Sequence, residues 1–323
     1  MIFKSIASLV LMTVRPRIRT GRPDAEVPLF YGFVTRGLDA AFEEACRRLK
    51  VTQMQTPQHS LGSKSAGGRI RFGDGSLGWL KVSGVPVGTM NPRRQREASP
   101  RVRNDIPTPQ VFRIIQWTSK AIRWQATTMS LVVFPTVDRF LADGGSLAGD
   151  DEWIARLRTA LSQIAALTCS HHCMTQEYVA HAILPRFGPD APHVATEWHT
   201  AHGDLSWGNL TAPELFVLDW ESWGLAPRAY DAAYLTVHSM EDVDLMLRLE
   251  QEFADEFSSS SGCVGLLVAC AEMLNRIEAE QLDAWHARNI EAIAQRGLHR
   301  YRATIASGTT GKSPRTRQVP QAE

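Results

Sequence analysis

The sequence lacks an excess of charge of either sign. It has 35 lysine and arginine residues against 34 aspartate and glutamate residues, a net charge of +1 over 323 residues. A protein drawn to nucleic acid or to an anionic membrane by its overall field carries a clear basic excess. We therefore expect no nucleic acid and no membrane among its partners. The charge balance favours a small-molecule ligand and leaves the oligomeric state open.

Cysteine is scarce, with five residues scattered along the chain. They are Cys46, Cys169, Cys173, Cys263 and Cys270. An odd, scattered set does not form the disulfide framework of a small secreted protein, so we expect a reducing, cytoplasmic environment. Residues 169–173 offer thiols and imidazoles, the ligand types that zinc prefers. Their Cys-x-His-His-Cys spacing is not a standard zinc arrangement, so a helix terminus is the favoured interpretation.

A long hydrophobic run is also missing from the N-terminus. The apolar stretch Ile6–Val14 is far shorter than the roughly 20 residues that span a bilayer. Arginines 15, 17 and 19 follow it, whereas a secretory signal places its positive charge before the apolar stretch. We expect residues 1–27 to be a poorly ordered arm that takes no part in catalysis.

The segment 28–134 is expected to form an N-terminal lobe built on an antiparallel sheet. Within Thr35–Leu49, apolar residues recur at spacings of three and four, which predicts one amphipathic helix. Glycines break the stretch Gln58–Ser83 into short apolar pieces, as in tight hairpins between strands. Residues 111–116 and 122–134 are rich in β-branched and aromatic residues, which predicts further strands.

The segment 135–306 is expected to be a mainly helical C-terminal lobe. One apolar stripe is formed by Trp153, Leu157, Leu161, Ile164 and Leu167. Apolar residues recur with the same helical spacing in 232–257, 263–282 and 284–306. The tail 307–323 has no periodicity and is predicted to be disordered. Strands followed by helices predict an α+β fold of two lobes.

The chemically informative stretch is His-Gly-Asp-Leu-Ser-Trp-Gly-Asn-Leu at 202–210, followed by Val-Leu-Asp-Trp-Glu at 217–221. Phosphoryl transfer needs a carboxylate that orients and deprotonates the acceptor hydroxyl, and oxygen ligands that hold Mg²⁺. Asp204 and Asn209 lie five positions apart and are followed by Asp219, which is how kinases meet that need. Any one of these residues alone would be read as a turn residue. The full string favours a functional role.

The spacing between the last two of these residues also has a geometric meaning. Leu210–Ala212 and Phe216–Leu218 can pair as a short hairpin. Asn209 and Asp219 would then lie opposite each other at its open end. Two oxygen ligands would converge on one ion from a rigid element.

With Gly224, Pro227, Asp231 and Ala233 after it, this string resembles the aminoglycoside phosphotransferase and small-molecule kinase family. The resemblance implies a protein-kinase-like fold with ATP or GTP held under the N-terminal sheet, together with Mg²⁺. It further implies roles for the residues that match. Asp204 would be the catalytic base and His202 a support for its loop, Asn209 and Asp219 would be the magnesium ligands, and Asp231 would tie the next helix to the loop.

The same resemblance implies a lysine that contacts the phosphates from the N-terminal lobe. Lys81 follows a glycine-rich turn in a predicted strand, and Glu97 is the nearest candidate for its carboxylate partner. The stretch 61–73 contains no Gly-x-Gly-x-x-Gly string. Gly67 and Gly68 are the expected loop over the nucleotide.

The predicted function is Mg²⁺-dependent transfer of a phosphoryl group to a hydroxyl of a small molecule, such as an aminoglycoside-like antibiotic or a metabolite. The alternative is a nucleotide-binding regulatory protein of kinase-like fold without transfer activity. Acidic residues at 241–256 could receive a cationic substrate, although a charge run is more often a solvated face. The P-loop-like string 308–313 lacks the required glycine spacing and a preceding strand.

Overall fold

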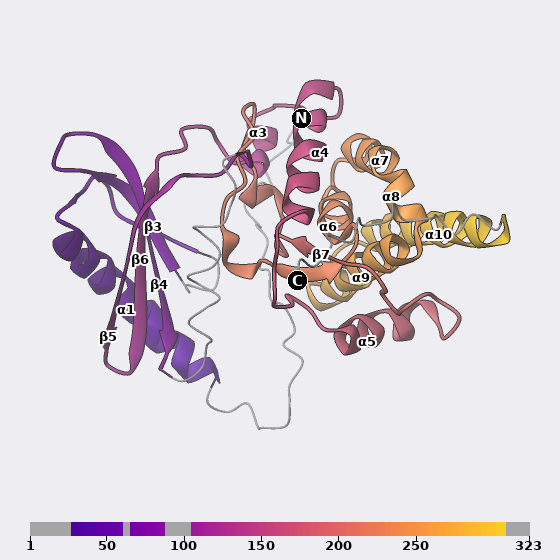
Figure 1. The fold of residues 1–323 in the computed structure, drawn as a ribbon, viewed down its shortest axis with the longest axis horizontal. Helices are drawn as coiled ribbons and strands as arrows, with labels where there is room; N and C mark the ends of the chain where they lie inside the picture. Colours follow the sequence, from indigo (N-terminus) through magenta and orange to yellow (C-terminus); the bar gives the residue numbers. More distant parts are fainter. Residues whose placement is uncertain (1–26, 61–64, 88–104, 308–323) are drawn as a thin grey trace, which may run out of the picture. The chain divides into compact units, whose positions relative to one another are not determined.

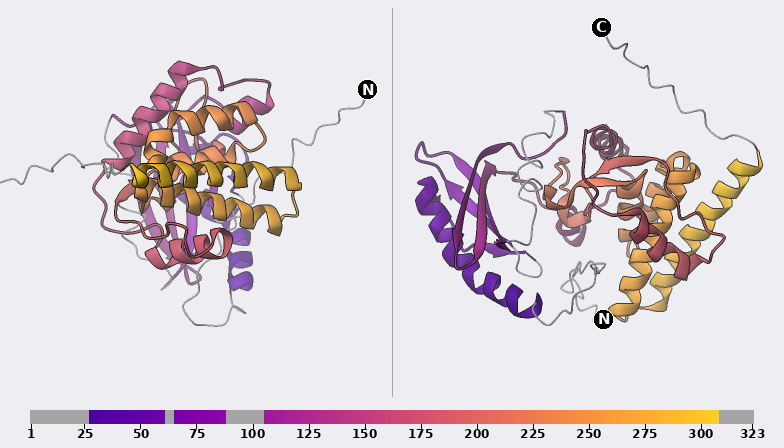
Figure 2. Two further views of the ribbon diagram at one scale, coloured as in Figure 1. Left: turned by 90° about the vertical axis from the view of Figure 1, so that its right-hand side faces the viewer. Right: turned by 60° about the horizontal axis from the view of Figure 1, so that its bottom comes forward.

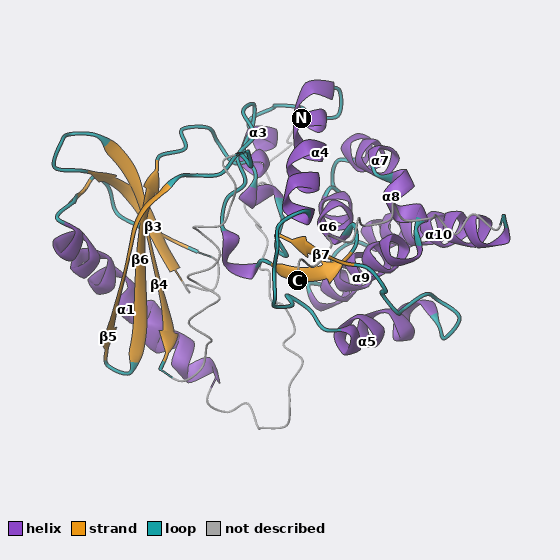
Figure 3. Cartoon of the chain, in the orientation of Figure 1, coloured by secondary structure: helices purple, strands orange, loops and turns teal. Residues whose placement is uncertain are grey.

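The computed structural model describes residues 27–60, 65–87 and 105–307, with side chains from Gly37 onward. The chain divides into two compact units. The first is drawn from Met1–Gly145 and Gly208–Glu221, and the second from Ser146–Trp207 and Ser222–Glu323. Strands gather in the first unit and helices in the second (Figure 1, Figure 3), which confirms the α+β class.

The division differs in detail from the expected lobes. The first unit extends to Gly145 and also includes Gly208–Glu221, a segment that was expected to belong to the helical lobe. Most of the expected arm, the segment 88–104 with Glu97, and the tail from residue 308 with its P-loop-like string lie outside the described residues.

An antiparallel sheet is the centre of the first unit. Its strands are β1 (Thr52–Gln53), β2 (Gln58–His59), β3 (Ser65–Arg71), β4 (Leu77–Pro86), β5 (Val111–Ser119) and β6 (Ile122–Ser130). They lie in the order β1-β3-β4-β6-β5, and β2 also pairs with β3. Gly75, in the turn from β3 to β4, has a φ of 89°, a conformation that glycine adopts without steric cost. The glycine-rich stretch therefore forms a tight hairpin, as predicted.

Helix α1 (Val27–Leu49) covers one face of this sheet (Figure 1, Figure 2). Leu38 and Phe42 are fully buried in one core with strand residues such as Ile70 and Leu80. Fully burying a side chain of this size contributes about 1.5–3 kcal/mol. Successive strand residues point to opposite faces, so Lys81, next to Leu80, faces away from α1. Because α1 covers one face of the sheet, only residues on the other face are available for a site.

Helices make up most of the second unit. They are α4 (Asp151–Ala165), α5 (Gln176–Phe187), α6 (Tyr230–His238), α7 (Val243–Glu252), α8 (Ala254–Ser258), α9 (Ser260–Ala279) and α10 (Ala284–Ala306). Strands β7 (Trp198–Ala201) and β8 (Gly224–Pro227) pair antiparallel. Every residue from Cys263 to Ala271 in α9 is buried, because α5, α6 and α10 pack around that helix. Figure 2 shows α10 running beside α9. In the described ranges, no helix is long and apolar enough to cross a bilayer.

Two glutamates of the acidic stretch around α7 pair with arginines of the same unit. Glu250 is only 4% exposed and accepts hydrogen bonds from Arg296 at 2.6 Å and Arg300 at 2.9 Å. Glu252 accepts from Arg248 at 2.8 Å. Asp242 caps the N-terminus of α7. These carboxylates serve ion pairs and a helix cap, so they give no support to capture of a cationic substrate.

We expect Glu250→Gln to lower the stability of the fold in a pH-dependent way. Burial raises the pKa of Glu250, but the hydrogen bonds from Arg296 and Arg300 outweigh it and hold the pKa below its usual range. The carboxylate therefore stabilises the fold above its unfolded-state pKa of about 4.3, and this is lost as the pH falls through the lower folded-state pKa. Losing these charge-assisted bonds costs about 1.5–3 kcal/mol.

Thermal melts of both proteins measure this effect. The two melting temperatures should differ near neutral pH and converge in acid. Glu241→Gln, an exposed position of the same acidic stretch, is the control and should melt like the parent protein. An equal difference at all pH values would contradict the charge-based explanation.

Candidate functional site

The predicted hairpin that carries Asn209 and Asp219 is present in the first unit. Leu210 bridges Val217 antiparallel, and the Leu218 amide donates to the Asn209 carbonyl at 2.8 Å. Leu210 and Val217 are fully buried, so the hairpin is anchored in the core. Asn209 and Asp219 follow from this pairing as neighbours at its open end, which confirms the geometric expectation.

The turn of this hairpin is fixed by one threonine. The Thr211 hydroxyl donates to the Glu214 carbonyl at 2.6 Å and accepts from the Phe216 amide at 2.9 Å. The strand after the turn is also tied to the unit, because the Val217 amide donates to the Pro107 carbonyl at 2.7 Å. Asn209 and Asp219 are thus carried by a rigid element.

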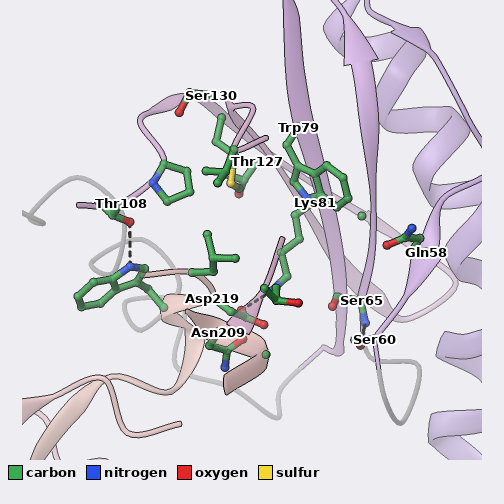
Figure 4. A pocket seen from close by; sticks show the side chains of 18 of the residues that line it. Gln58, Ser60, Ser65, Trp79, Lys81, Thr108, Thr127, Ser130, Asn209 and Asp219 are labelled. Atoms are coloured by element: carbon green, nitrogen blue, oxygen red, sulfur yellow. Dashed lines mark hydrogen bonds and ion pairs between the residues drawn. The ribbon is translucent and has the colours of Figure 1, made fainter. Parts of the chain in front are cut away.

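Lys81 on β4 reaches this hairpin. Its ammonium group forms an ion pair with the carboxylate of Asp219 (Figure 4). It forms a second ion pair with the carboxylate of Glu221 at 3.0 Å. Burial lowers the pKa of Lys81, but the two nearby negative charges outweigh it, so the pKa lies above its ordinary value. Lys81 therefore stays positively charged at all physiological pH values.

The backbone at Asp219 is in the left-handed region, with a φ of 62°. Among non-glycine residues, Asp and Asn adopt this conformation most readily, because their short polar side chains bond locally. The left-handed residue comes directly after the paired strand. An Asp at position 219 therefore serves both the local conformation and the negative charge near Lys81.

A pocket of about 640 Å³ lies within the first unit, lined by residues of the sheet and of the hairpin. From the sheet come Gly67, Trp79, Lys81, Gln125, Thr127 and Met129, and from the hairpin Asn209, Asp219 and Glu221. Figure 4 shows Trp79, Lys81, Thr127, Asn209 and Asp219 around this pocket. The sheet residues share the face that α1 leaves uncovered. The structure therefore brings together Lys81, Asn209, Asp219 and Gly67 of the predicted site.

The two glycines expected to form a loop over a nucleotide differ in position. Both lie inside strand β3, where Gly67 pairs with Lys81 and Gly68 with Leu80. A Cβ on Gly68 would meet Phe42 at 3.1 Å, so Gly68 faces α1 and does not line the pocket. The expectation fails because neighbouring strand residues point to opposite faces. Gly67 faces the pocket as a strand residue instead of a loop residue.

Gly67 has a packing reason to be glycine. A Cβ at this position would lie 2.7 Å from the indole ring of Trp79, closer than real side-chain contacts. The Trp79 ring therefore lies over the Gly67 backbone. It forms part of the pocket wall (Figure 4). An aromatic wall beside a fixed cation suits a planar ligand that carries negative charge.

His202 and Asp204 belong to the second unit, where α6 holds their loop. The buried carboxylate of Asp231 accepts from the amides of His202 at 2.6 Å and Gly203 at 3.0 Å. This confirms that Asp231 ties the helix after the motif to the loop. Gly203 has a φ of 76°, and a Cβ there would lie 2.6 Å from the Ser222 carbonyl oxygen. Only glycine fits between His202 and Asp204.

Asp204 itself is partly exposed and accepts a hydrogen bond from the Tyr234 hydroxyl at 3.4 Å. The sequence analysis did not identify Tyr234, Trp79 or Glu221. Glu221 could have been found, because it lies two residues after Asp219 and is a second carboxylate next to a candidate metal ligand. Trp79 could likewise have been found from its position two residues before Lys81, on the same strand face.

Comparison with known proteins gives structural matches. No protein-family model matches the chain, and no curated protein matches its sequence. The aminoglycoside phosphotransferase APH(4)-Ia is similar, with a TM-score of 0.51 and 15% identity over 83% of this chain and 98% of that chain. An amicoumacin kinase has a TM-score of 0.51 and 9% identity, over 83% and 96% of the two chains.

A choline/ethanolamine kinase family protein from Mesorhizobium loti is a third similar structure. Its TM-score is 0.50 and its identity 14%, over 81% of this chain and 99% of that chain. This chain therefore has the protein-kinase-like fold of small-molecule kinases. The fold implied by the resemblance is confirmed.

Proposed function

We propose that this protein is an Mg²⁺-dependent O-phosphotransferase that moves the γ-phosphoryl group of ATP or GTP to a hydroxyl of a small molecule. The acceptor oxygen forms a bond to the γ-phosphorus, and the bond from that phosphorus to the bridging oxygen breaks. The hydroxyl proton passes to Asp204, and a nucleoside diphosphate leaves. These are the elements of phosphoryl transfer in kinases.

The observation that carries the proposal is the shared pocket of Lys81, Asn209 and Asp219. A permanently charged ammonium group neutralises phosphate oxygens. The carboxylate of Asp219 and the carboxamide oxygen of Asn209 are hard oxygen ligands, so this donor set fits Mg²⁺. Bound Mg²⁺ would supply neutralisation of charge on the phosphates. The pocket volume of about 640 Å³ suits a nucleotide-sized ligand.

The remaining residues of the string have supporting roles in the proposal. Asp204, five positions before Asn209, orients the acceptor hydroxyl and takes its proton. His202 and Asp231 hold the loop that carries Asp204. Glu221 is a second carboxylate at the pocket and, together with Asp219, holds Lys81 in place.

Ligands of similar structures support the choice of substrates. A variant of APH(4)-Ia with a TM-score of 0.50 was solved with ADP and hygromycin B. The amicoumacin kinase was solved in complex with AMP-PNP, Ca²⁺ and a third component abbreviated Ami. A nucleotide, a divalent cation and a hydroxylated small molecule are therefore reasonable ligands for this chain.

A screen of acceptors tests the proposal. Release of ADP or GDP is measured with Mg²⁺ and a panel of aminoglycosides, sugars, amino alcohols and nucleosides, and Asp204→Ala serves as the inactive control. An acceptor should raise nucleotide consumption by the parent protein but not by Asp204→Ala. Tight nucleotide binding without consumption by any acceptor would instead favour a regulatory protein without transfer activity.

Nucleotide binding should depend on the packing of Trp79 over Gly67. Stacking of a base on an aromatic side chain is worth about 1–3 kcal/mol, so Trp79→Ala should weaken binding by about five- to 150-fold. Gly67→Ala should do the same by displacing the indole ring. Binding is measured by titration calorimetry with Mg²⁺ and AMP-PNP.

Gly73→Ala is the matched control for the glycine substitution. A Cβ at Gly73 meets nothing within 4 Å, so this variant should bind the nucleotide like the parent protein. Unchanged affinity in both Gly67→Ala and Trp79→Ala would show that the ligand does not use this wall.

A further inference from the structure

Helix α6 meets the loop 202–204 at two positions one turn apart. The Asp231 carboxylate accepts from the backbone amides of His202 and Gly203, and the Tyr234 hydroxyl donates to Oδ1 of Asp204 at 3.4 Å. Residues three apart on a helix share one face. A single face of α6 therefore contacts both the backbone of this loop and its carboxylate, entirely within the second unit.

The Tyr234 ring is held by its neighbours. It is only 7% exposed. Its centroid lies 4.1 Å from the ring of His238 and 5.7 Å from that of Tyr230. A buried ring packed between two others has little rotamer freedom, so the direction of its hydroxyl is set before any ligand binds.

His238 is neutral where it packs against Tyr234. Burial, together with the positive charge of Arg276, lowers the pKa of His238 to about 3. The imidazole therefore does not change charge at physiological pH. In this contact it acts as a packing surface that fixes the phenol, while the carboxylate of Asp204 accepts from the phenol hydroxyl.

We propose that Tyr234 is a positioning residue for Asp204, holding one carboxylate oxygen so that the other is directed to the acceptor hydroxyl. This rests on the proposed function, because it takes Asp204 as the base. The phenol keeps its proton throughout. Its contribution is orientation, which accelerates a reaction when the reacting atoms are held in a productive geometry.

Tyr230 provides a matched control on the same helix. Its hydroxyl donates to Oε2 of Glu272 at 2.7 Å, and the Tyr178 hydroxyl donates to the other carboxylate oxygen. Tyr230→Phe and Tyr234→Phe remove the same atom from buried rings one turn apart. Only the second removes a hydrogen bond to Asp204.

The test compares steady-state hydrolysis of Mg²⁺-ATP, with water as the acceptor, by the full chain and its variants. Tyr234→Phe should lower kcat by about three- to tenfold, as expected for one net hydrogen bond, and leave KM for ATP unchanged. Tyr230→Phe should keep kcat within about twofold of the parent protein. In an Asp204→Ala background, Tyr234→Phe should cause no further loss.

Thermal melts give a readout that does not require turnover. Tyr234→Phe should lower the melting temperature of the parent protein more than that of Asp204→Ala, where the hydrogen bond to Asp204 is already absent. An equal decrease in both backgrounds would mean that the Tyr234 hydroxyl contributes to stability independently of Asp204, which would overturn the proposal.

Two kinetic outcomes separate this proposal from the function on which it rests. If Tyr234→Phe matched Tyr230→Phe in kcat while Asp204→Ala lost turnover, the positioning role would be wrong and the transferase function would stand. If Asp204→Ala kept the turnover of the parent protein, both would be overturned.

Discussion

Asp219→Asn is expected to lower Mg²⁺-dependent turnover by at least about a hundredfold without unfolding the chain. Metal-assisted stabilisation of charge in a transition state is worth several kcal/mol, and each step of about 1.36 kcal/mol is a factor of ten in rate. The substitution removes the negative charge of a proposed magnesium ligand. Lys81 keeps Glu221 as an ion-pair partner at 3.0 Å, so it is not left unpaired in the pocket.

Asparagine is a sharper replacement than alanine at this position because of the backbone. The φ of 62° at Asp219 lies in a region that asparagine adopts readily and alanine does not. Asp219→Ala would combine loss of the ligand with strain in the hairpin. Asp219→Asn changes the charge and keeps the conformation.

Glu214→Gln is the control for this prediction. Glu214 is an exposed carboxylate at the turn of the same hairpin, at the opposite end from Asp219. Turnover and melting temperature should match the parent protein. The assay measures nucleotide consumption over a range of Mg²⁺ concentrations. If Asp219→Asn kept a tenth or more of the turnover, a requirement for the negative charge of Asp219 at the metal would be refuted.

Local patterns in the sequence were sufficient for much of the fold and for the hairpin. The spacing of Leu38 and Phe42 predicted which face of α1 is buried, because the apolar residues that define the helical period are also the residues that pack into the core. Asn209 and Asp219 were predicted as neighbours because the strands between them are short and the turn leaves little freedom. Interactions between near neighbours in sequence follow from local rules.

Partners distant in sequence could not be predicted in this way. The ion pairs of Lys81 with Asp219 and Glu221, about 140 positions later, were not predicted. The expected partner, Glu97, lies outside the described residues. Gly68 was grouped with Gly67 because both are glycine, although strand alternation sends them to opposite faces. Which face of the sheet lines the pocket depends on where α1 packs, and that packing is a tertiary interaction.

The acidic stretch around α7 illustrates the same limit for charge. The sequence shows a run of carboxylates, and such a run can be a solvated face or a binding surface. It does not show that Arg296 and Arg300, on α10, come to lie against the buried Glu250. Whether a charge is available to a ligand is decided by packing between helices.

The string from His202 to Asn209 contributes to both compact units. Residues through Trp207 belong to the second unit, and the hairpin from Gly208 belongs to the first. The loop of the proposed base is held by α6, and the proposed metal ligands are held by the core beside the sheet. A change on α6 should therefore affect turnover separately from nucleotide binding.

Asp231→Ala is expected to give the largest loss of stability among these variants, together with loss of turnover. The carboxylate is 7% exposed and accepts from two buried backbone amides. Leaving a buried donor unsatisfied costs about 1–3 kcal/mol, so removing the acceptor of both should cost about 2–6 kcal/mol. Thermal unfolding should show a decrease of about 5–15 °C. Calorimetry below the melting point should still detect nucleotide binding.

Asp231→Asn is the intermediate variant for this prediction, and Asp255→Ala is its control. A carboxamide offers one acceptor oxygen for the two amides, so Asp231→Asn should fall between the parent protein and Asp231→Ala. Asp255 is an exposed acidic residue of the same unit, and Asp255→Ala should melt within about a degree or two of the parent protein. A contrary result would be that Asp231→Ala melts like the parent protein but loses nucleotide affinity. The effect of Asp231 on turnover would then not be separate from its effect on nucleotide binding.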